Sequence, residues 1–306
     1  MAPRGRHVLS DYRELAVVAV AAAVGLTVQG PLAWAVRHQG IDILLVILVF
    51  FTALTIEPRT LCDLPSAWRR LSVALIAGIT VLPALSWSVA HLVTAGPLRD
   101  GVTTIGLAPC EIASIATTAM AGGDVALAGG LLVGSTVLTV LLAGPILAAE
   151  ASGTALNPWH ILVNLLCIVA LPLGAGMAIR GTLQPSRRIT DAASTVSMLS
   201  VAALVALVAS EVRFAKSYLS VLVAVVAFLV VSAGVGLLVG RGGAPPVRGA
   251  LLLTLSMRDF AIAAGLATAA FGPAAAAPLG IYGIAVLLWG TGAAGFIRAG
   301  DASNAA

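Results

Sequence analysis

The stretch GLAPCEIAS, residues 106–114, places a proline and a carboxylate where an apolar membrane helix would otherwise continue without a break. Pro109 lacks a backbone N–H and disfavours helical geometry in the residue before it, so it predicts an interruption of the helix. An ionisable side chain such as Glu111 costs about 2.5 to 3.5 kcal/mol at the centre of a membrane helix, and it therefore usually faces protein or water and marks a pathway. The stretch predicts a broken helix that carries a functional acid.

A second stretch, TLSMRDFAIA at 254–263, places Arg258 and Asp259 in another apolar segment. It contains no proline, so an interruption here would have to come from the charges and from a crossing helix. The alternative role for Glu111, Arg258 and Asp259 is a structural ion pair that joins two helices.

The composition shows which solvent surrounds these charges. The chain of 306 residues is 59% hydrophobic and 10% charged, its mean hydropathy is +1.05, and an average soluble domain is about 25% charged. These values predict a polytopic membrane protein. A net charge of +4 does not indicate nucleic-acid binding, because the basic residues are scattered between apolar runs and aromatic residues make up only 5%. The cysteines Cys62, Cys110 and Cys167 have neither C-x-x-C nor metal-ligand spacing, so neither a disulfide framework nor a zinc site is expected.

Ten apolar runs are interpreted as membrane spans, since crossing the hydrocarbon core takes about 20 helical residues. They lie near 14–35, 41–56, 71–94, 102–121, 124–148, 159–180, 190–210, 217–240, 247–271 and 274–297. The first run is longer than the about 7 to 15 apolar residues of a signal peptide, so we expect it to be retained. The expected fold class is an all-α polytopic membrane protein.

Arginine placement predicts the orientation, because cytoplasmic loops carry an excess of Lys and Arg. With the N-terminus inside, the cytoplasmic segments hold Arg4, Arg6, Arg13, Arg59, Arg69, Arg70, Arg180, Arg187, Arg188, Arg241, Arg248 and Arg298. The opposite side holds only Arg37, Arg99, Arg213 and Lys216. We therefore expect a protein of the cell membrane with both termini and the loops 57–70 and 180–189 in the cytoplasm.

The polar segment AAEASGTALNPWH divides the chain into halves of five spans each, 1–150 and 151–306. Aligning APCEIASIATTAMAGGDVAL with SMRDFAIAAGLATAAFGPAAA pairs Cys110 with Arg258 and Glu111 with Asp259, so the two acids coincide. An odd number of spans per half makes the second half enter from the opposite side, which predicts an inverted repeat. Chance similarity in an alanine-rich chain is the alternative.

Inverted-repeat transporters place their binding sites near the midplane, where interrupted helices meet. The candidate substrate- or ion-binding residues are Cys110, Glu111, Ser114, Thr117, Thr118, Thr254, Ser256, Arg258 and Asp259. Weaker candidates for lining the cavity are Asn164, Ser194 and Ser197. The alternative for the hydroxyl groups is a hydrogen bond to their own helix or close packing of small residues, and Cys110 alone could be a small buried apolar side chain.

The segments APCEIASIATTAMAGGDVALAGGLLVGSTVLTVLLAGPIL and SMRDFAIAAGLATAAFGPAAAAPLGIYGIAVLL resemble the bile acid:sodium symporter superfamily, also called the sodium/bile acid cotransporter family. The resemblance covers the chain in span number and is most specific in spans 4, 5, 9 and 10. It implies ten transmembrane helices in two inverted five-helix repeats, with a core domain of spans 3–5 and 8–10 and a panel domain of spans 1, 2, 6 and 7. It also implies that the broken spans 4 and 9 cross at the midplane, and that a bile-acid-like or carboxylate anion is transported by alternating access.

The departures from the family pattern concern sodium. Ser114 matches a sodium-binding serine of the family, but Ile115 replaces the asparagine that follows it. The family's acidic ligand on span 9 aligns with Thr254, its glutamine with Arg258, its asparagine with Asp259 and its span 3 glutamine with Gly78. A sodium site needs a ring of oxygens, whereas a guanidinium group can only donate. Sodium remains possible at Ser114 and Thr254, but the expected coupling is weakened or absent, and a proton is the alternative coupling ion. Arg258 is expected either to do part of the work of sodium or to bind the carboxylate of the substrate.

The stretch GLAPC also resembles the arsenite efflux permeases, in which a cysteine of this break takes part in metalloid transport, and Cys110 fits that position. The span 9 glutamate of that branch, however, aligns with Ala261, which departs from the permease pattern. Arsenite efflux is therefore kept as the alternative function. A channel or membrane scaffold is a third one. An enzyme is not expected, because H-E-x-x-H and G-x-S-x-G motifs are absent and the histidines, His7, His38, His91 and His160, lie near span ends.

The remaining expectations concern ligands and partners. No cofactor is expected besides the coupling ion, and no metal centre. The expected partners are the lipid bilayer and a small anionic substrate, nucleic acid is not expected, and the chain is expected to be a monomer.

Overall fold

The computed structural model describes residues 17, 19–56, 68–94, 96–150, 157–211 and 217–304, and within these ranges it contains helices and no β-strand. The α-helices are α2 Gln29–Arg37, α3 Gly40–Ala53, α4 Trp68–Ala90, α5 Pro97–Thr103, α6 Ala113–Met120, α7 Val125–Glu150, α8 Pro158–Leu165, α9 Leu171–Leu183, α10 Arg187–Ser210, α11 Ser217–Val239, α12 Pro245–Ser256, α13 Phe260–Phe271 and α14 Ala277–Asn304. A π-helical turn, η2, spans Leu166–Ala170, and a 3-10 turn, η3, spans Pro273–Ala276. The all-helical class is confirmed for the described residues.

The helices that could cross a membrane are fewer than the ten predicted spans. Six described helices are long and apolar enough: Trp68–Ala90, Val125–Ala149, Pro158–Leu183, Arg187–Ser210, Tyr218–Val239 and Pro273–Ala299. A bent pair, Ala19–Thr27 and Gln29–Arg37, passes the same test together, while α3 and α13 are shorter apolar helices. The chain is thus a multi-pass membrane protein, and the count of ten spans stays a prediction.

The first predicted span, 14–35, is not a straight helix. Its residues 14–16 and 18 lie outside the described residues, and the remainder bends by 95° between Ala19–Thr27 and α2. Val28, at the bend, has the non-helical angles φ −107° and ψ 54°. An unbroken apolar run shows that a segment avoids water, but it does not show whether neighbouring helices leave room for a straight path.

Local chemistry sets several helix ends. Pro97, Pro158 and Pro245 begin α5, α8 and α12, at a position where a backbone N–H would have no partner within the helix. The Oδ1 atom of Asn157 accepts hydrogen bonds from the N–H groups of Trp159 and His160, at 3.0 and 3.4 Å, and so caps α8.

Both predicted interruptions are present. The predicted span 102–121 contains the end of α5 and all of α6, separated by the irregular segment 104–112 that includes Pro109. The predicted span 247–271 is divided into α12 and α13 at 257–259, where Asp259 caps α13. The second break therefore forms without a proline, as predicted, because a side chain and a crossing segment satisfy the freed backbone groups.

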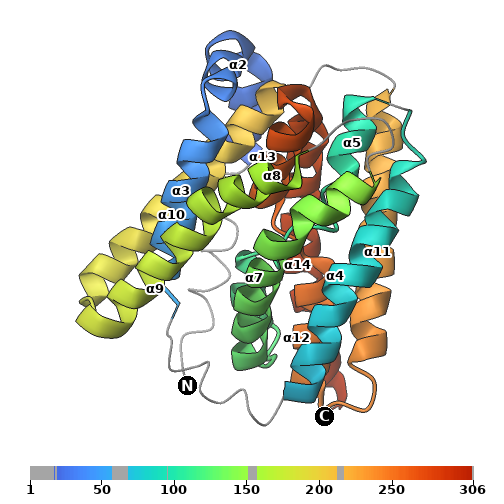
Figure 1. Cartoon of the computed structure of the whole chain (residues 1–306). Helices are drawn as coiled ribbons and strands as arrows, with labels where there is room; N and C mark the ends of the chain where they lie inside the picture. Colours follow the sequence, from blue (N-terminus) through green and yellow to red (C-terminus); the bar gives the residue numbers. More distant parts are fainter. Residues whose placement is uncertain are drawn as a thin grey trace.

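The helices pack in two groups (Figure 1). In the first group α3 packs against α9 and α10, and in the second α11 packs against α4, α12 and α14, while α4 also contacts α7. Helix α13 contacts α3, α5 and α14, so the second broken span reaches both groups.

The arginine-rich loops lie at one end of the molecule. In Figure 1 the ends of α9 and α11 and the beginnings of α4, α10 and α12 share the lower side. The Nη2 atom of Arg70 donates to the carbonyl oxygen of Gly242 at 3.2 Å, which joins the beginning of α4 to the loop after α11. Of the basic residues on which the expected orientation rests, Arg4, Arg6, Arg13, Arg59, Arg213 and Lys216 lie outside the described residues, and the orientation stays a prediction.

The orientation can be tested by cysteine labelling at Ser186, an exposed residue before α10. We expect Ser186→Cys to resist a membrane-impermeant maleimide added outside intact cells and to react after permeabilisation, because its loop is arginine-rich. Leu92→Cys, at the opposite end after α4, is the control and should react from outside. If Ser186→Cys reacted from outside and Leu92→Cys did not, the orientation would be the opposite of the expected one.

Gly106 tests the packing of the first break. A Cβ atom at this position would collide with the carbonyl oxygen of Leu82 and the Oγ atom of Ser86, both on α4. We expect Gly106→Ala to lower the free energy of unfolding by about 1 to 3 kcal/mol, the usual cost of overpacking, measured by thermal unfolding in detergent. Gly174→Ala is the matched control, since a Cβ atom at Gly174 on α9 meets nothing within 4 Å. An equal loss of stability in the two variants would contradict the close approach of Gly106 to α4.

Candidate functional site

The two interruptions cross and pair through their backbones. The N–H of Glu111 donates to the carbonyl oxygen of Met257 at 2.8 Å, and the N–H of Asp259 donates to the carbonyl oxygen of Pro109 at 2.9 Å. Cys110 and Arg258 lie opposite each other at the centre of this antiparallel bridge. The repeat alignment matches residues 109–111 with residues 257–259. Under this alignment the hydrogen bond from Glu111 to Met257 corresponds to the one from Asp259 to Pro109, so the bridge is symmetric.

The central N–H groups donate to hydroxyl groups on α7 and α14. The N–H of Cys110 donates to the Oγ atom of Ser135 on α7 at 3.0 Å, and the N–H of Arg258 donates to the Oη atom of Tyr282 on α14 at 2.9 Å. Sequence analysis did not identify Ser135 or Tyr282. The available signal was the tyrosine itself, because a buried tyrosine hydroxyl usually finds a partner.

Both acids lie at the N-terminal end of α13. The Oδ1 atom of Asp259 accepts hydrogen bonds from the N–H groups of Ala261 and Ile262, at 3.0 and 2.9 Å. The Oε2 atom of Glu111 accepts one from the N–H of Phe260 at 3.3 Å. The first N–H groups of a helix have no partners within the helix and carry partial positive charge, so they stabilise the two carboxylates. The Oδ2 atom of Asp259 is different, because it is buried without a hydrogen-bond partner.

Arg258 lies at the crossing, but its side chain turns away from the acids. The residue is 1% exposed, its Nη1 atom contacts the Sγ atom of Cys110 at 3.6 Å, and its Nε atom has no partner. A Cβ atom placed on Gly78 of α4 would lie 3.6 Å from Nη1, so the guanidinium group lies against this glycine. The three charged residues meet at the crossing, and within the described residues no ion pair joins Arg258 to Glu111 or Asp259.

The extended backbone at the crossing explains this separation. Successive side chains of an extended segment point to opposite faces, and residues paired across an antiparallel bridge share one face. Cys110 and Arg258 therefore point to one side, and Glu111 and Asp259 point to the other. The repeat alignment matched the two residues at the centre of the bridge, Cys110 and Arg258, but it did not indicate the faces.

The predicted hydroxyl residues divide into two kinds. Thr117, Thr254 and Ser256 donate hydrogen bonds to carbonyl groups of their own helices, and Ser256 also accepts one from the Nε1 atom of Trp289 at 2.9 Å. Ser114 and Thr118, one turn apart on α6, are fully buried and have no partner for their hydroxyl groups. Own-helix bonding, the alternative considered above, thus applies to the first three residues, and Ser114 and Thr118 retain free hydroxyl groups.

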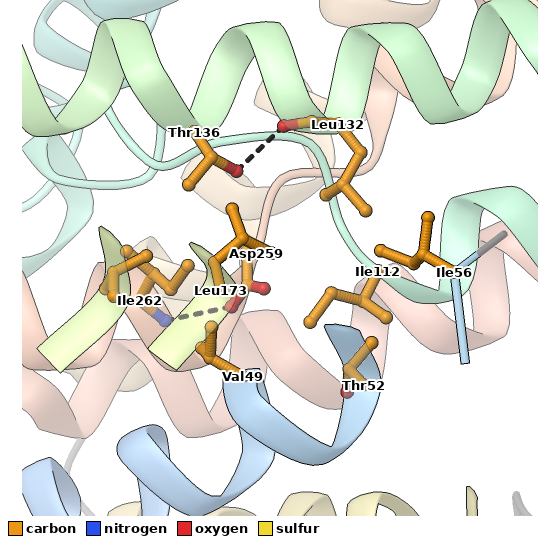
Figure 2. A pocket seen from close by; sticks show the side chains of 10 residues that line it. Val49, Thr52, Ile56, Ile112, Leu132, Thr136, Leu173, Asp259 and Ile262 are labelled. Atoms are coloured by element: carbon orange, nitrogen blue, oxygen red, sulfur yellow. Dashed lines mark hydrogen bonds between the residues drawn. The ribbon is translucent and has the colours of Figure 1, made fainter. Parts of the chain in front are cut away.

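A small cavity lies beside the acids, between the two groups of helices. Its volume is about 10 Å³, about the room that one water molecule needs. Aliphatic side chains from α3, α7, η2, α9 and α13 form most of its wall, and the polar lining residues are Thr52, Thr136 and Asp259. Figure 2 shows Asp259 among these side chains, with its Oδ1 atom bonded to the N–H of Ile262.

The weaker candidates contribute little to this cavity. The Oγ atom of Ser197 is hydrogen-bonded to the Oγ1 atom of Thr52 at 2.7 Å, so it contacts a lining residue. Ser194 is exposed, Asn164 is half-buried, and neither lines the cavity, nor does Cys110. Thr52 and Thr136 were missed, because a threonine in an apolar helix gives no signal in the sequence of what it will contact.

Removing a hydroxyl group that bonds the crossing should destabilise the protein. We expect Ser135→Ala and Tyr282→Phe each to lower the free energy of unfolding by about 1 to 3 kcal/mol, because each leaves a buried backbone N–H without a partner. Ser232→Ala is the control, since the buried Ser232 hydroxyl only bonds the carbonyl oxygen of Leu229 in its own helix. Thermal unfolding at constant detergent and lipid compares the three, and a loss no larger than that of Ser232→Ala would mean that water replaces these bonds.

Two comparisons with known proteins gave matches to this chain. The model of a family described as the Sodium Bile acid symporter family matches residues 42–221, more than half of the chain. The matched range includes the first break and ends before α12. The chain is also 24% identical over 276 residues to the "Uncharacterized sodium-dependent transporter YocS" of Bacillus subtilis (strain 168), covering 87% of this chain and 85% of that protein.

Proposed function

The chain belongs to the Sodium Bile acid symporter family, and from this membership we propose that it transports a small organic anion, bile-acid-like or another carboxylate, by alternating access. That it is a membrane transporter follows from the family and from the sodium-dependent transporter that it resembles. The observation that carries the finer proposal is the crossing of two broken helices with three buried charged residues, since transporters bind their ligands where interrupted helices meet.

The packing supports a division into two moving parts. We propose ten spans in two inverted repeats, 1–150 and 151–306, with a core of spans 3–5 and 8–10 and a panel of spans 1, 2, 6 and 7. In this division α3, α9 and α10 belong to the panel, and the small cavity lies where the panel meets the core. A cavity of about 10 Å³ is far too small for a bile acid. The substrate would therefore enter only when the two parts separate.

The surroundings of Cys110 favour an organic anion over arsenite. Cys110 is 1% exposed, its thiol group contacts the guanidinium group of Arg258, and the residue does not line the cavity. A thiolate that binds a metalloid would have to be reached by it.

Arg258 supports weak or absent sodium coupling. In the alignment with the family Arg258 and Gly78 replace two sodium-ligating glutamines, and here the guanidinium group lies against Gly78. A permanently charged group at this place would hold the broken helices together as a bound cation does, but it cannot dissociate and so cannot couple transport to a gradient. A proton is then the simplest remaining coupling ion.

The substrate class can be tested by thermal unfolding with a panel of carboxylates, bile acids and arsenite, each with and without sodium. A ligand that binds only the folded protein stabilises it by about 2.7 kcal/mol at a concentration 100 times its dissociation constant. We expect a carboxylate or a bile acid to stabilise the protein, with little effect of sodium. Stabilisation by arsenite alone would instead support metalloid efflux.

The role of Arg258 can be tested by Arg258→Gln. We expect the ratio of bile-acid uptake with sodium to uptake without sodium to rise about fivefold or more in proteoliposomes, because an amide oxygen restores a sodium ligand. Arg248→Gln, at an exposed position of α12, is the control and should leave the ratio unchanged. A loss of substrate affinity without a change in the ratio would mean that Arg258 binds the substrate carboxylate.

A further inference from the structure

We infer that the Oδ2 atom of Asp259 carries the exchangeable proton of this transporter, and that the small cavity beside it is where this proton enters and leaves. The inference rests on the proposed function, since a coupled proton presupposes transport. It assigns the proton to one acid of the two at the crossing.

The two oxygens of the Asp259 carboxyl group have different surroundings. Oδ1 accepts hydrogen bonds from the N–H groups of Ala261 and Ile262, while Oδ2 is buried without a partner. A buried charged oxygen without a partner is costly. A proton on Oδ2 makes the group neutral, and Oδ1, as the carbonyl oxygen of the acid, still accepts both bonds. The observed arrangement therefore accommodates the protonated acid without rearrangement.

The space around Oδ2 selects a proton over a larger cation. The cavity has room for about one water molecule, its wall is mostly aliphatic, and within the described part of the chain its side-chain oxygens come from Thr52, Thr136 and Asp259. A sodium ion needs a ring of oxygens to replace its hydration shell, and three side chains supply too few. A proton can reach Oδ2 through one water molecule or a threonine hydroxyl group.

The neighbouring titratable groups leave this role to Asp259. The cavity residues of α3, α7, η2 and α9 include no titratable side chain. Glu111, on the same face of the crossing, is bonded to the N–H of Phe260 and does not line the cavity. Arg258 and Cys110 point to the opposite face and contact each other, and the Tyr282 hydroxyl accepts the N–H of Arg258. Of the two acids at the crossing, Asp259 is thus the one that lines the cavity between the two groups of helices.

The position of the cavity couples release of the proton to separation of the two groups of helices. The cavity is bounded by α3, η2 and α9 on one side and by α7 and the crossing on the other, so separation of the two groups opens it. The step is the breaking of one O–H bond, in which the carboxyl group becomes a carboxylate and the proton passes to a water molecule. In the closed arrangement the proton is held away from solvent.

Infrared difference spectroscopy of the purified protein in lipid tests the inference without any substrate. A protonated carboxyl group has its own C=O stretching band, which disappears as the pH rises. We expect one such band to be lost in Asp259→Asn, retained in Glu111→Gln and shifted in its titration in Asp259→Glu. Asn can still cap α13 through its side-chain oxygen, so the variant should fold. A spectrum of Asp259→Asn that keeps every titrating band of the parent protein would overturn the assignment.

Proteoliposome uptake of a labelled bile acid gives the second readout. We expect accumulation driven by a pH gradient to fall in Asp259→Asn to the level without a gradient, and to be unchanged in Asp191→Asn, an exposed acid of α10. Accumulation driven only by sodium, and equal in Asp259→Asn and the parent protein, would overturn the inference while leaving the proposed transport intact. The expected infrared band without uptake of any anion would support the protonation of Asp259 and overturn the proposed substrate class.

Discussion

The antiparallel backbone pairing of the two breaks is the constraint on which the structure of this site depends. Inside a bilayer no water can bond the N–H and C=O groups that a broken helix frees, so each must find a partner in the protein. Here the freed groups of Glu111 and Asp259 bond across the crossing, and the hydroxyl groups of Ser135 and Tyr282 bond the N–H groups at its centre. Two irregular segments can therefore persist at this depth only together.

This pairing also sorts the charges. Because the backbone is extended at the crossing, neighbouring side chains point to opposite faces. The cation, Arg258, lies with Cys110 and against Gly78, while both acids lie at the N-terminal end of α13. An ordinary pair of helices with the same three charges could have formed a closed ion pair. The extended geometry keeps the acids free of direct pairing, which leaves one of them available to the cavity.

The crossing and the cavity have different mechanical roles. The crossing is held by backbone hydrogen bonds within one group of helices, whereas the cavity lies where that group meets α3 and α9, packed through aliphatic side chains. Directional hydrogen bonds resist relative motion more than aliphatic contacts do, since those contacts are non-directional. If the proposed alternating access moves one group past the other, the charged site can stay intact while the space beside Asp259 opens and closes.

The sequence by itself determined the membrane class, the family resemblance, the two interruptions and the residues that meet at them. These features follow from local chemistry: apolar runs, Pro109 and the cost of buried charge act within a few residues, and the alignment of the two acids links the halves. Only the tertiary structure decided the 95° bend after Thr27 and the direction of the Arg258 side chain. It also decided which hydroxyl groups bond the crossing, those of Ser135 and Tyr282, and which threonines line the cavity, Thr52 and Thr136. Arg258 and Cys110 are 148 residues apart in the chain. The face that each side chain occupies depends on the register in which two such distant segments pair, and no local pattern of residues encodes that register.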